Sequence, residues 1–534
     1  MIIGSYSLFG DYVSVVKVHV FAVNSIMDRR EFLKLSAVFA LMGTRASQLM
    51  GNLDKLVTGQ KHPNVIILLF DTLSAKYMSL YDYPRNTTPN IDRFAKKATV
   101  YHNHYTAGNF TTPATASILT GTYPWFHRAL HMRGSILSRH TQKNIFRLIP
   151  SNIYKVAYTH NLLAFSLLSQ LRDSINYLKK PRDLALYDPQ YSDQLFPSDY
   201  NVSLLSENTI LRGNKNLNPT SPLMSLMYIN HVYVNKTNIM NEIGSTFPRG
   251  IPQIDNMFFI LEDFYDWMLD EITKLPHPFL MYIHLIPPHG PYNTRRDFKD
   301  IFEDDYEPIS KPEHFFSQGY GNEHLNNLRR DYDEYLAYAD NQFGRLYSFM
   351  EDNGIFDTSY VIFTSDHGEL FERGIHGHLT QTLFEPIIRV PLIISKPRQD
   401  KREDVYNPTS SVDILPTLMR LYNQPIPEWC EGDVLPNFCT VPLQVDRDIY
   451  TVEAKSNPKY GSLKKASIAL RKGDYKLVRY MGYPGYHNEF ECFNIKQDPD
   501  ELNNIFSLEN KAVGELIEIM DLKLSEVNRA YEEK

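Results

Sequence analysis

The chain has 534 residues, of which 43% are hydrophobic and 22% charged, an ordinary globular composition that excludes wholesale disorder. Its net charge of −7 includes no basic excess of the kind that binds nucleic acid, so no nucleic-acid partner is expected. Three cysteines are too few for a disulfide scaffold.

The first informative segment lies near the N-terminus. Met27 opens the run MDRREFLKLSAVFALMGTRA, in which Arg29 and Arg30 precede a short apolar stretch. This pattern, over residues 27–50 of an N-terminal segment 1–60, resembles a twin-arginine signal, which the export machinery reads as an address. The alternative is an amphipathic helix that happens to begin with two arginines.

The signal predicts an exported protein, located in the periplasm, at the cell surface or in the medium. Its apolar run is shorter than the roughly 20 residues of a membrane-spanning helix. No small-x-small cleavage site is evident, so membrane anchoring by an uncleaved signal stays open beside release.

The predicted elements of the catalytic region begin with a strand over 64–70, an apolar run typical of strands buried on both faces. A helix follows over 89–98. Another is predicted over 113–121, with Pro113 in its first turn, a threonine before it as N-cap and Gly121 at its end. Residues 144–159 predict a helix and then a strand.

Residues 175–250 are polar and weakly periodic, and we interpret them as an insertion over the sheet. The remaining elements are an amphipathic helix, a strand, a long polar helix and two further strands, predicted over 254–273, 278–286, 325–351, 360–364 and 389–395. The alternation of strands and helices predicts an α/β fold with a doubly wound, mostly parallel sheet.

Polar residues follow three of the predicted strands. They are Asp71, His289 and the pair Asp366-His367. Ligands of open parallel sheets bind beyond the carboxyl ends of the strands, and Asp and His side chains suit a divalent cation. Asp71 alone could be a strand-end cap, and Asp366-His367 alone a tight turn closed by Gly368. Together they favour a metal site.

Several segments in a fixed order carry a family resemblance. They are NVIILLFDTLSAKYMSLYDYPRNTTPNIDRFA, TTPATASILTGTYP, PPHGPY, SDHGEL, RVPLII, SVDILPTLM, RKGDYKLVRY and FNIKQDPDELNN. The chain thereby resembles the sulfatase-like branch of the alkaline phosphatase superfamily. The resemblance implies a catalytic α/β domain over 61–435 and a C-terminal α+β subdomain with a small antiparallel sheet over 436–534.

The resemblance also implies site residues. One divalent cation, Ca, Mg, Mn or Zn, would be held by Asp71, Thr111, Asp366 and His367. Thr111 occupies the position of the family's Cys or Ser nucleophile, and His289 matches a histidine near the reacting ester. His378 roughly matches a Lys or His in the same role, and His376 competes with it for that assignment.

The chain departs from the sulfatase pattern at three positions. Thr111 cannot become formylglycine, because its β-carbon carries a methyl group. Thr115 stands where the motif has an arginine, and Thr72 stands at the second acidic metal position. Other branches of the superfamily use a threonine alkoxide, so the departures put the formylglycine mechanism in doubt and leave the rest of the machinery intact.

The chemistry can also be argued from the residues themselves. A threonine hydroxyl is a weak nucleophile at neutral pH, but a helix N-terminus and a cation would both activate Thr111. His289 and His378 could donate a proton to the leaving oxygen. Thr112, one position further along the helix, is expected to point about 100° away and to serve as a cap or in packing rather than in attack.

These observations predict an exported, metal-dependent, sulfatase-like hydrolase that acts on sulfate or phosphate/phosphonate esters through Thr111. The substrate is expected to be a small molecule, or an ester of a glycan or lipid head. The alternatives are a phosphoryl-group transferase of the same superfamily and a non-catalytic anion-binding relative. Cys430 and Cys439 either pair outside the cytoplasm or stay free thiols, and both interpretations are open.

Overall fold

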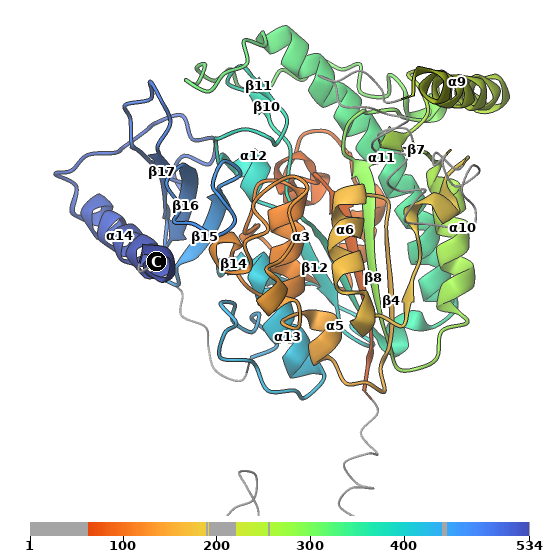
Figure 1. Ribbon diagram of the computed structural model, residues 1–534, viewed down its shortest axis with the longest axis horizontal. Helices are drawn as coiled ribbons and strands as arrows, with labels where there is room; N and C mark the ends of the chain where they lie inside the picture. Colours follow the sequence, from red (N-terminus) through yellow and green to blue (C-terminus); the bar gives the residue numbers. More distant parts are fainter. Residues whose placement is uncertain (1–61, 188–190, 192–220, 255–256, 440–445, 533–534) are drawn as a thin grey trace, which may run out of the picture. The chain divides into compact units, whose positions relative to one another are not determined.

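The computed structural model describes residues 62–187, 191, 221–254, 257–439 and 446–532. They belong to one compact unit, His62–Lys534, built around an eight-stranded sheet with the order β13-β2-β12-β9-β1-β8-β4-β5 (Figure 1). The predicted export signal lies outside the described residues.

The centre of the sheet is parallel. β1 (Asn64–Asp71) lies between β8 (Phe279–Pro288) and β9 (Ser359–Ser365) and runs parallel to both. Beyond β8 come β4 (Tyr154–Thr159) and β5 (Tyr177–Leu178), again parallel. The predicted doubly wound, mostly parallel sheet is confirmed.

The opposite edge of the sheet contains its antiparallel strand. β12 (Leu392–Ser395) runs antiparallel to β9 and to β2 (Thr99–Tyr101), and β13 (Glu403–Val405) pairs parallel with β2. The strand predicted over 389–395 therefore begins three residues late. Pro391 has no N–H to donate to a ladder, and the short helix α12 (Glu385–Ile388) occupies the approach.

Alternate residues of β1 enter two separate cores, as the two-residue period of a strand requires. Val65, Ile67 and Leu69 pack on one side with the helices α3 (Thr111–Thr120), α5 (Ile145–Leu148), α6 (Leu162–Gln170) and α13 (Ile414–Leu421). Ile66, Leu68 and Phe70 pack on the other with α2 (Pro89–Ala95), α10 (Leu261–Ile272) and α11 (Asn322–Asp352).

Two helix predictions need correction at their N-termini. α3 starts at Thr111 rather than Pro113, its N-cap residue is Phe110, and no side chain caps it, so the predicted threonine cap is wrong. α10 starts seven residues late, because the pairing strands β6 (Gln253–Ile254) and β7 (Met257–Phe258) take up the beginning of the predicted segment.

The insertion contains a helix that its weak periodicity concealed. α9 (Pro222–Ile243) begins with Pro222 in its first turn and with Ser221 accepting a hydrogen bond from the Met224 N–H. It lies at the upper right of Figure 1, and several of its apolar side chains are exposed, including Leu223 and Tyr233. Because α9 buries little of its surface, the sequence contains no stripe of apolar residues there.

The C-terminal region forms the predicted small antiparallel sheet. Its strands are β15 (Ile449–Glu453), β16 (Ala466–Lys472), β17 (Tyr475–Met481) and β18 (Phe490–Asn494). Helix α14 (Lys511–Glu532) packs on this sheet, and the same core includes Tyr123 and Trp125 from the α/β region. A boundary at residues 435–436 stays a prediction.

Short elements complete the fold: β3 (His104–Tyr105) with β14 (Thr409–Ser410), β10 (Phe371–Glu372) with β11 (Ile375–His376), and α4 (Pro124–His127). Cys430, Cys439 and Cys492 are free thiols, so of the two interpretations the structure shows unpaired cysteines. Within the described ranges, no helix is both long and apolar enough to cross a membrane.

Candidate functional site

Two buried carboxylates meet at the carboxyl edge of the sheet. Asp71 is the last residue of β1, and Asp366 directly follows the neighbouring parallel strand β9. Asp366 Oδ1 accepts hydrogen bonds from the backbone N–H groups of His367 and Thr72, at 2.9 and 3.4 Å. Among the described residues, Asp71 Oδ1 and Asp366 Oδ2 have no hydrogen-bond partner, although both side chains are fully buried. These two oxygens are therefore available to a ligand.

His367 faces both carboxylates. Its Nε2 lies 3.6 Å from Asp71 Oδ1 and 3.5 Å from Asp366 Oδ2. Its Nδ1 lies 3.0 Å from the Gly368 carbonyl oxygen, which can only accept, so Nδ1 carries the hydrogen and Nε2 presents its lone pair. Burial lowers the pKa of His367, which favours this neutral form. A neutral imidazole oriented through its other nitrogen is the form that binds metals.

Thr111 is the first residue of α3 and reaches the same point. Its Oγ1 lies 3.4 Å from His367 Nε2 and accepts a hydrogen bond from Asn161 Nδ2 at 3.2 Å. The Asn161 amide also donates to Asp71 Oδ2 at 2.6 Å. The structure thus brings Asp71, Thr111 and His367 together, as the sequence analysis expected, and adds Asn161.

Asn161 could have been found from the sequence. It comes two residues after β4, whose carboxyl end meets the same edge of the sheet as that of β1. Its Oδ1 also accepts from the Leu163 N–H at the start of α6, which makes it the N-cap of that helix. A strand followed at once by a capping residue was the available signal.

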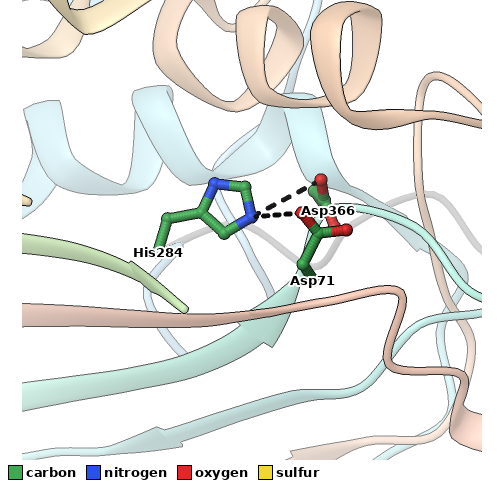
Figure 2. Close-up of side chains that lie close together, drawn as sticks. All are labelled: Asp71, His284 and Asp366. Atoms are coloured by element: carbon green, nitrogen blue, oxygen red, sulfur yellow. Dashed lines mark ion pairs between the residues drawn. The ribbon is translucent and has the colours of Figure 1, made fainter. Parts of the chain in front are cut away.

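His284 is a site residue that the sequence analysis missed. It lies inside β8, with its Nε2 3.4 Å from Asp71 Oδ2 and 3.6 Å from Asp366 Oδ2 (Figure 2). Ligand atoms of these three side chains all lie within 4.8 Å of one another. Its signal was a single histidine within an otherwise mostly apolar strand.

The surroundings of Asp71 and Asp366 shift the pKa values of the two carboxyl groups in opposite directions. Burial opposes ionisation of Asp71, but the histidines around it, His284 foremost, hold its pKa well below the usual range. Burial and the neighbouring Asp71 charge raise the pKa of Asp366 to about 6. Two carboxylates this close cannot both ionise readily without a cation between them.

The three remaining candidate histidines, His289, His376 and His378, lie in two groups. His378 lies beside His367 and His289, with ring centroids 4.4 and 5.1 Å apart respectively. His376 Nε2 instead lies 2.8 Å from Tyr292 Oη, within hydrogen-bond distance of that hydroxyl. The geometry thus favours His378 over His376 as a neighbour of the site.

Glu369 connects these groups and was also missed. Its Oε1 lies 3.0 Å from His378 Nδ1, and its Oε2 accepts from Tyr292 Oη at 3.4 Å. Burial opposes ionisation of Glu369, but His378 keeps its pKa below the usual value. The carboxylate therefore holds the hydrogen of His378 on Nδ1 and leaves Nε2 free. Glu369 follows the Asp366-His367 pair by only two residues, so its position in the motif was the available signal.

Two of the three departures from the sulfatase pattern, Thr72 and Thr115, have buried hydroxyl groups without a described hydrogen-bond partner. Thr72 has a φ of 62°, unusual for a β-branched residue, and its buried Oγ1 has no hydrogen-bond partner among the described residues. The Thr115 Oγ1, one turn beyond Thr111 in α3, is likewise buried without a described partner. Thr112 does not cap the helix, because its Oγ1 donates to the Met132 carbonyl oxygen at 2.5 Å.

Comparison with known proteins extends over nearly the whole described unit. A family model described as "Sulfatase" matches residues 63–423, and one described as "N-sulphoglucosamine sulphohydrolase, C-terminal" matches residues 374–530. The choline-sulfatase of Rhizobium meliloti is 24% identical over 485 residues, which cover 84% of this chain and 83% of the relative.

A second relative and a solved structure are also similar to most of the chain. The N-acetylglucosamine-6-O-sulfatase of Bacteroides thetaiotaomicron is 23% identical over 506 residues, covering 89% of this chain and 87% of the relative. The crystal structure of a phosphonate monoester hydrolase of Agrobacterium radiobacter superposes with a TM-score of 0.61 at 17% identity, covering 86% of this chain and 95% of that one. At this identity the structural likeness shows the shared alkaline phosphatase-like fold alone.

Proposed function

The chain belongs to the sulfatase family and is a sulfatase-like hydrolase, and we propose that it is metal-dependent and uses Thr111 in place of formylglycine as its nucleophile. The observation that carries the proposal is the position of Thr111 Oγ1. It lies at the start of α3, between His367 Nε2 and the Asn161 amide that also binds Asp71.

The residues at the sheet edge fit a divalent cation. Asp71 and Asp366 each present a buried oxygen without a described hydrogen-bond partner, and His367 presents the lone pair of Nε2 to both. In the proposal, Asp71, Thr111, Asp366 and His367 hold the ion. When bound, a divalent cation lowers the pKa of a ligating hydroxyl and offsets the charge of a tetrahedral anion.

Thr111 is placed to attack. Asn161 donates to its Oγ1 and so stabilises negative charge on that oxygen, and the N-terminus of α3 favours an anion at the same place. Thr111 Oγ1 releases its proton to water and forms a bond to the sulfur or phosphorus, and the bond from that atom to the ester oxygen breaks. Water then cleaves the Thr111 ester and restores the hydroxyl.

His378 and His289 serve the leaving oxygen in this proposal. Each has its Nδ1 held by a neighbour, His378 by Glu369 and His289 by the Gly290 carbonyl oxygen at 2.6 Å, so each directs Nε2 elsewhere. In the imidazolium form of either ring, Nε2 also carries a hydrogen, and delivery of that proton neutralises the departing alkoxide. The His378 ring is in contact with the His367 ring, and His367 Nε2 faces the Thr111 hydroxyl.

The substrate class is a sulfate or phosphate/phosphonate ester of a small molecule, a glycan or a lipid head. The names of the relatives support sulfate esters of choline and of amino sugars, and the threonine supports phosphorus as an alternative centre. The expected screen uses aryl sulfates, phosphate monoesters, phosphate diesters and phosphonates, each with added Mn²⁺, Mg²⁺, Ca²⁺ or Zn²⁺. Transfer to an added alcohol would identify a transferase, and anion binding without turnover would identify a non-catalytic relative.

The nucleophile is tested with two neighbouring variants. Thr111→Ala should lower turnover by several orders of magnitude, and Thr111→Ser should keep partial activity because the hydroxyl remains. Thr112→Ala is the matched control, since it removes the hydrogen bond to Met132 and should cost about 1 kcal/mol of stability with little effect on turnover. Trapping with a slow substrate should place the covalent ester on Thr111, and an ester on Thr112 would contradict the assignment.

We also propose export through the Arg29-Arg30 signal, on the basis of its sequence alone. Residues 1–60 fused to a folded reporter should carry it out of the cytoplasm, and replacing both arginines by lysine should stop this. Equal export of the two fusions would contradict the proposal. Detection of residues 27–50 in the exported product would identify an anchored form.

A further inference from the structure

His284 is a buried histidine to which the strand around it offers no hydrogen-bond partner among the described residues. It is fully buried within β8, and neither of its ring nitrogens has a hydrogen-bond partner among the described residues. A buried polar group without a hydrogen-bond partner costs about 1–3 kcal/mol of stability. A ligand bound beside His284 would remove this cost. Figure 2 shows its Nε2 directed at Asp71 and Asp366.

The spacing around these carboxylates is that of a small coordination sphere. His284 Nε2 lies 3.4 Å from Asp71 and 3.6 Å from Asp366, and His367 Nε2 lies 3.6 and 3.5 Å from the same two side chains. Metal–ligand distances of about 2.0–2.2 Å in a tetrahedral zinc site correspond to ligand–ligand distances of roughly 3.3–3.6 Å. Asp71 uses a different oxygen toward each imidazole, whereas Asp366 uses Oδ2 toward both.

We propose that His284 is a ligand of the bound cation, and that the site therefore selects a zinc-class transition ion over Ca²⁺ or Mg²⁺. The inference rests on the metal-dependent site proposed above. It makes Asp71, His284, Asp366 and His367 the tetrahedral set and leaves Thr111 as a fifth ligand, an expansion that catalytic zinc sites allow. Two imidazole nitrogens and two carboxylates suit zinc and its neighbours, whereas Ca²⁺ and Mg²⁺ prefer sites built from oxygen. Thr72, next to Asp71, has no carboxylate, so it adds no further charged oxygen ligand that would favour Ca²⁺ or Mg²⁺.

The competing interpretation is a protonated His284 that neutralises the two carboxylates without touching a metal. The two interpretations predict opposite effects of removing the imidazole. Loss of a ligand weakens metal binding, whereas loss of a positive charge between two carboxylates strengthens the binding of any cation. Metal affinity therefore separates them without any assay of turnover.

The experiment measures binding of Zn²⁺, Mn²⁺ and Ca²⁺ to the metal-stripped protein by competition with a chelator of known affinity. The wild type should bind Zn²⁺ more tightly than Ca²⁺ by at least about 100-fold. His284→Gln should lower zinc affinity by roughly 10–100-fold and change calcium affinity much less. His104→Gln is the matched control, because His104 is equally buried and its Nδ1 is bonded to Thr409 on β14.

Zinc affinity in His284→Gln equal to or above that of the wild type would overturn the proposal. If that variant does not fold, X-ray absorption of the zinc-loaded wild type decides, with two coordinated imidazoles expected and one contradicting the inference. The outcome is separable from the proposed function. A protein that binds zinc through His284 and hydrolyses no ester would refute only the hydrolase mechanism, and an active enzyme with unchanged zinc binding in His284→Gln would refute only this inference.

Discussion

Asn161 shows how a single amide group can organise two site residues. Its Nδ2 donates to both Asp71 Oδ2 and Thr111 Oγ1, while its Oδ1 accepts from the first turn of α6. The amide cannot turn around without losing the helix cap, so both donors stay directed at the site. The proposed nucleophile and the first carboxylate are thereby held in one fixed relation.

Glu369 is expected to act through His378 rather than on the substrate. Glu369→Gln keeps an acceptor for His378 Nδ1 but removes the charge that holds its hydrogen there. We predict that kcat falls by roughly 10–100-fold while KM changes little. The loss should be larger for substrates with poor leaving groups, because these depend most on the proton that we propose His378 supplies.

The measurement compares aryl esters with leaving groups of increasing pKa. The metal content of Glu369→Gln should equal that of the wild type, because Glu369 bonds to His378 and Tyr292 and not to the proposed metal ligands. Equal losses for good and poor leaving groups, or a loss of metal, would refute the positioning role.

At the scale of elements, the turn after β9 depends on a close approach between two backbones. A Cβ added to Gly368 would lie 2.0 Å from the carbonyl oxygen of Pro386 in α12, and the Gly368 N–H donates to the Ile387 carbonyl oxygen at 2.7 Å. The absence of a side chain thus lets α12 press against the turn that carries Asp366 and His367.

Gly368→Ala should therefore destabilise the fold by about 3 kcal/mol and reduce metal binding, because the displaced turn moves His367. Gly514→Ala in α14 is the matched control. A Cβ there meets nothing within 4 Å, so this change should stabilise the helix by about 0.5–1 kcal/mol. Chemical denaturation measures both, and similar effects of the two substitutions would contradict the packing argument.

At the scale of the whole molecule, a buried ion cluster joins the two sheets. Lys476 on β17 pairs with Glu385 on α12 and with Glu501, and donates to the Leu383 carbonyl oxygen at 3.0 Å. Burial works against the charge of Lys476, but Glu501 and Glu385 raise its pKa above the usual value. The cation is therefore one of the links between the α/β region and the small antiparallel sheet.

Lys476→Met should cost about 3–5 kcal/mol at pH 7, because two buried carboxylates then lack their cation. In this variant the folded-state pKa of the carboxylates rises above the unfolded value. Their contribution to stability is then fully present below about pH 4.3 and is lost as the pH rises through the folded pKa.

The destabilisation should therefore shrink from pH 8 to pH 5. In the wild type, burial opposes ionisation of Glu385, but Lys476 lowers its pKa below the usual value. The stabilisation that the Glu385–Lys476 ion pair contributes is therefore lost only as the pH falls below the usual range for Glu. Denaturation curves at several pH values measure the difference. A cost independent of pH would contradict the ionic origin of the effect.

The sequence alone determined the sheet and much of the site, because both depend on local pattern. The continuous apolar runs predicted the buried parallel strands, and polar residues placed directly after them predicted that Asp71, Asp366 and His367 would meet at one edge. Parallel neighbouring strands end at the same edge, so a linear signal was enough. Helix α9 and the antiparallel direction of β12 gave no comparable signal.

Only the tertiary structure decided which side chains from other segments complete the site. His284 lies within an apolar strand, and its role depends on the register between β8 and β1 rather than on any motif. The different surroundings of His378 and His376 depend on Glu369 and Tyr292, which lie far apart in the chain and meet by packing. Contacts between distant segments are set by three-dimensional packing, and a sequence pattern does not contain them.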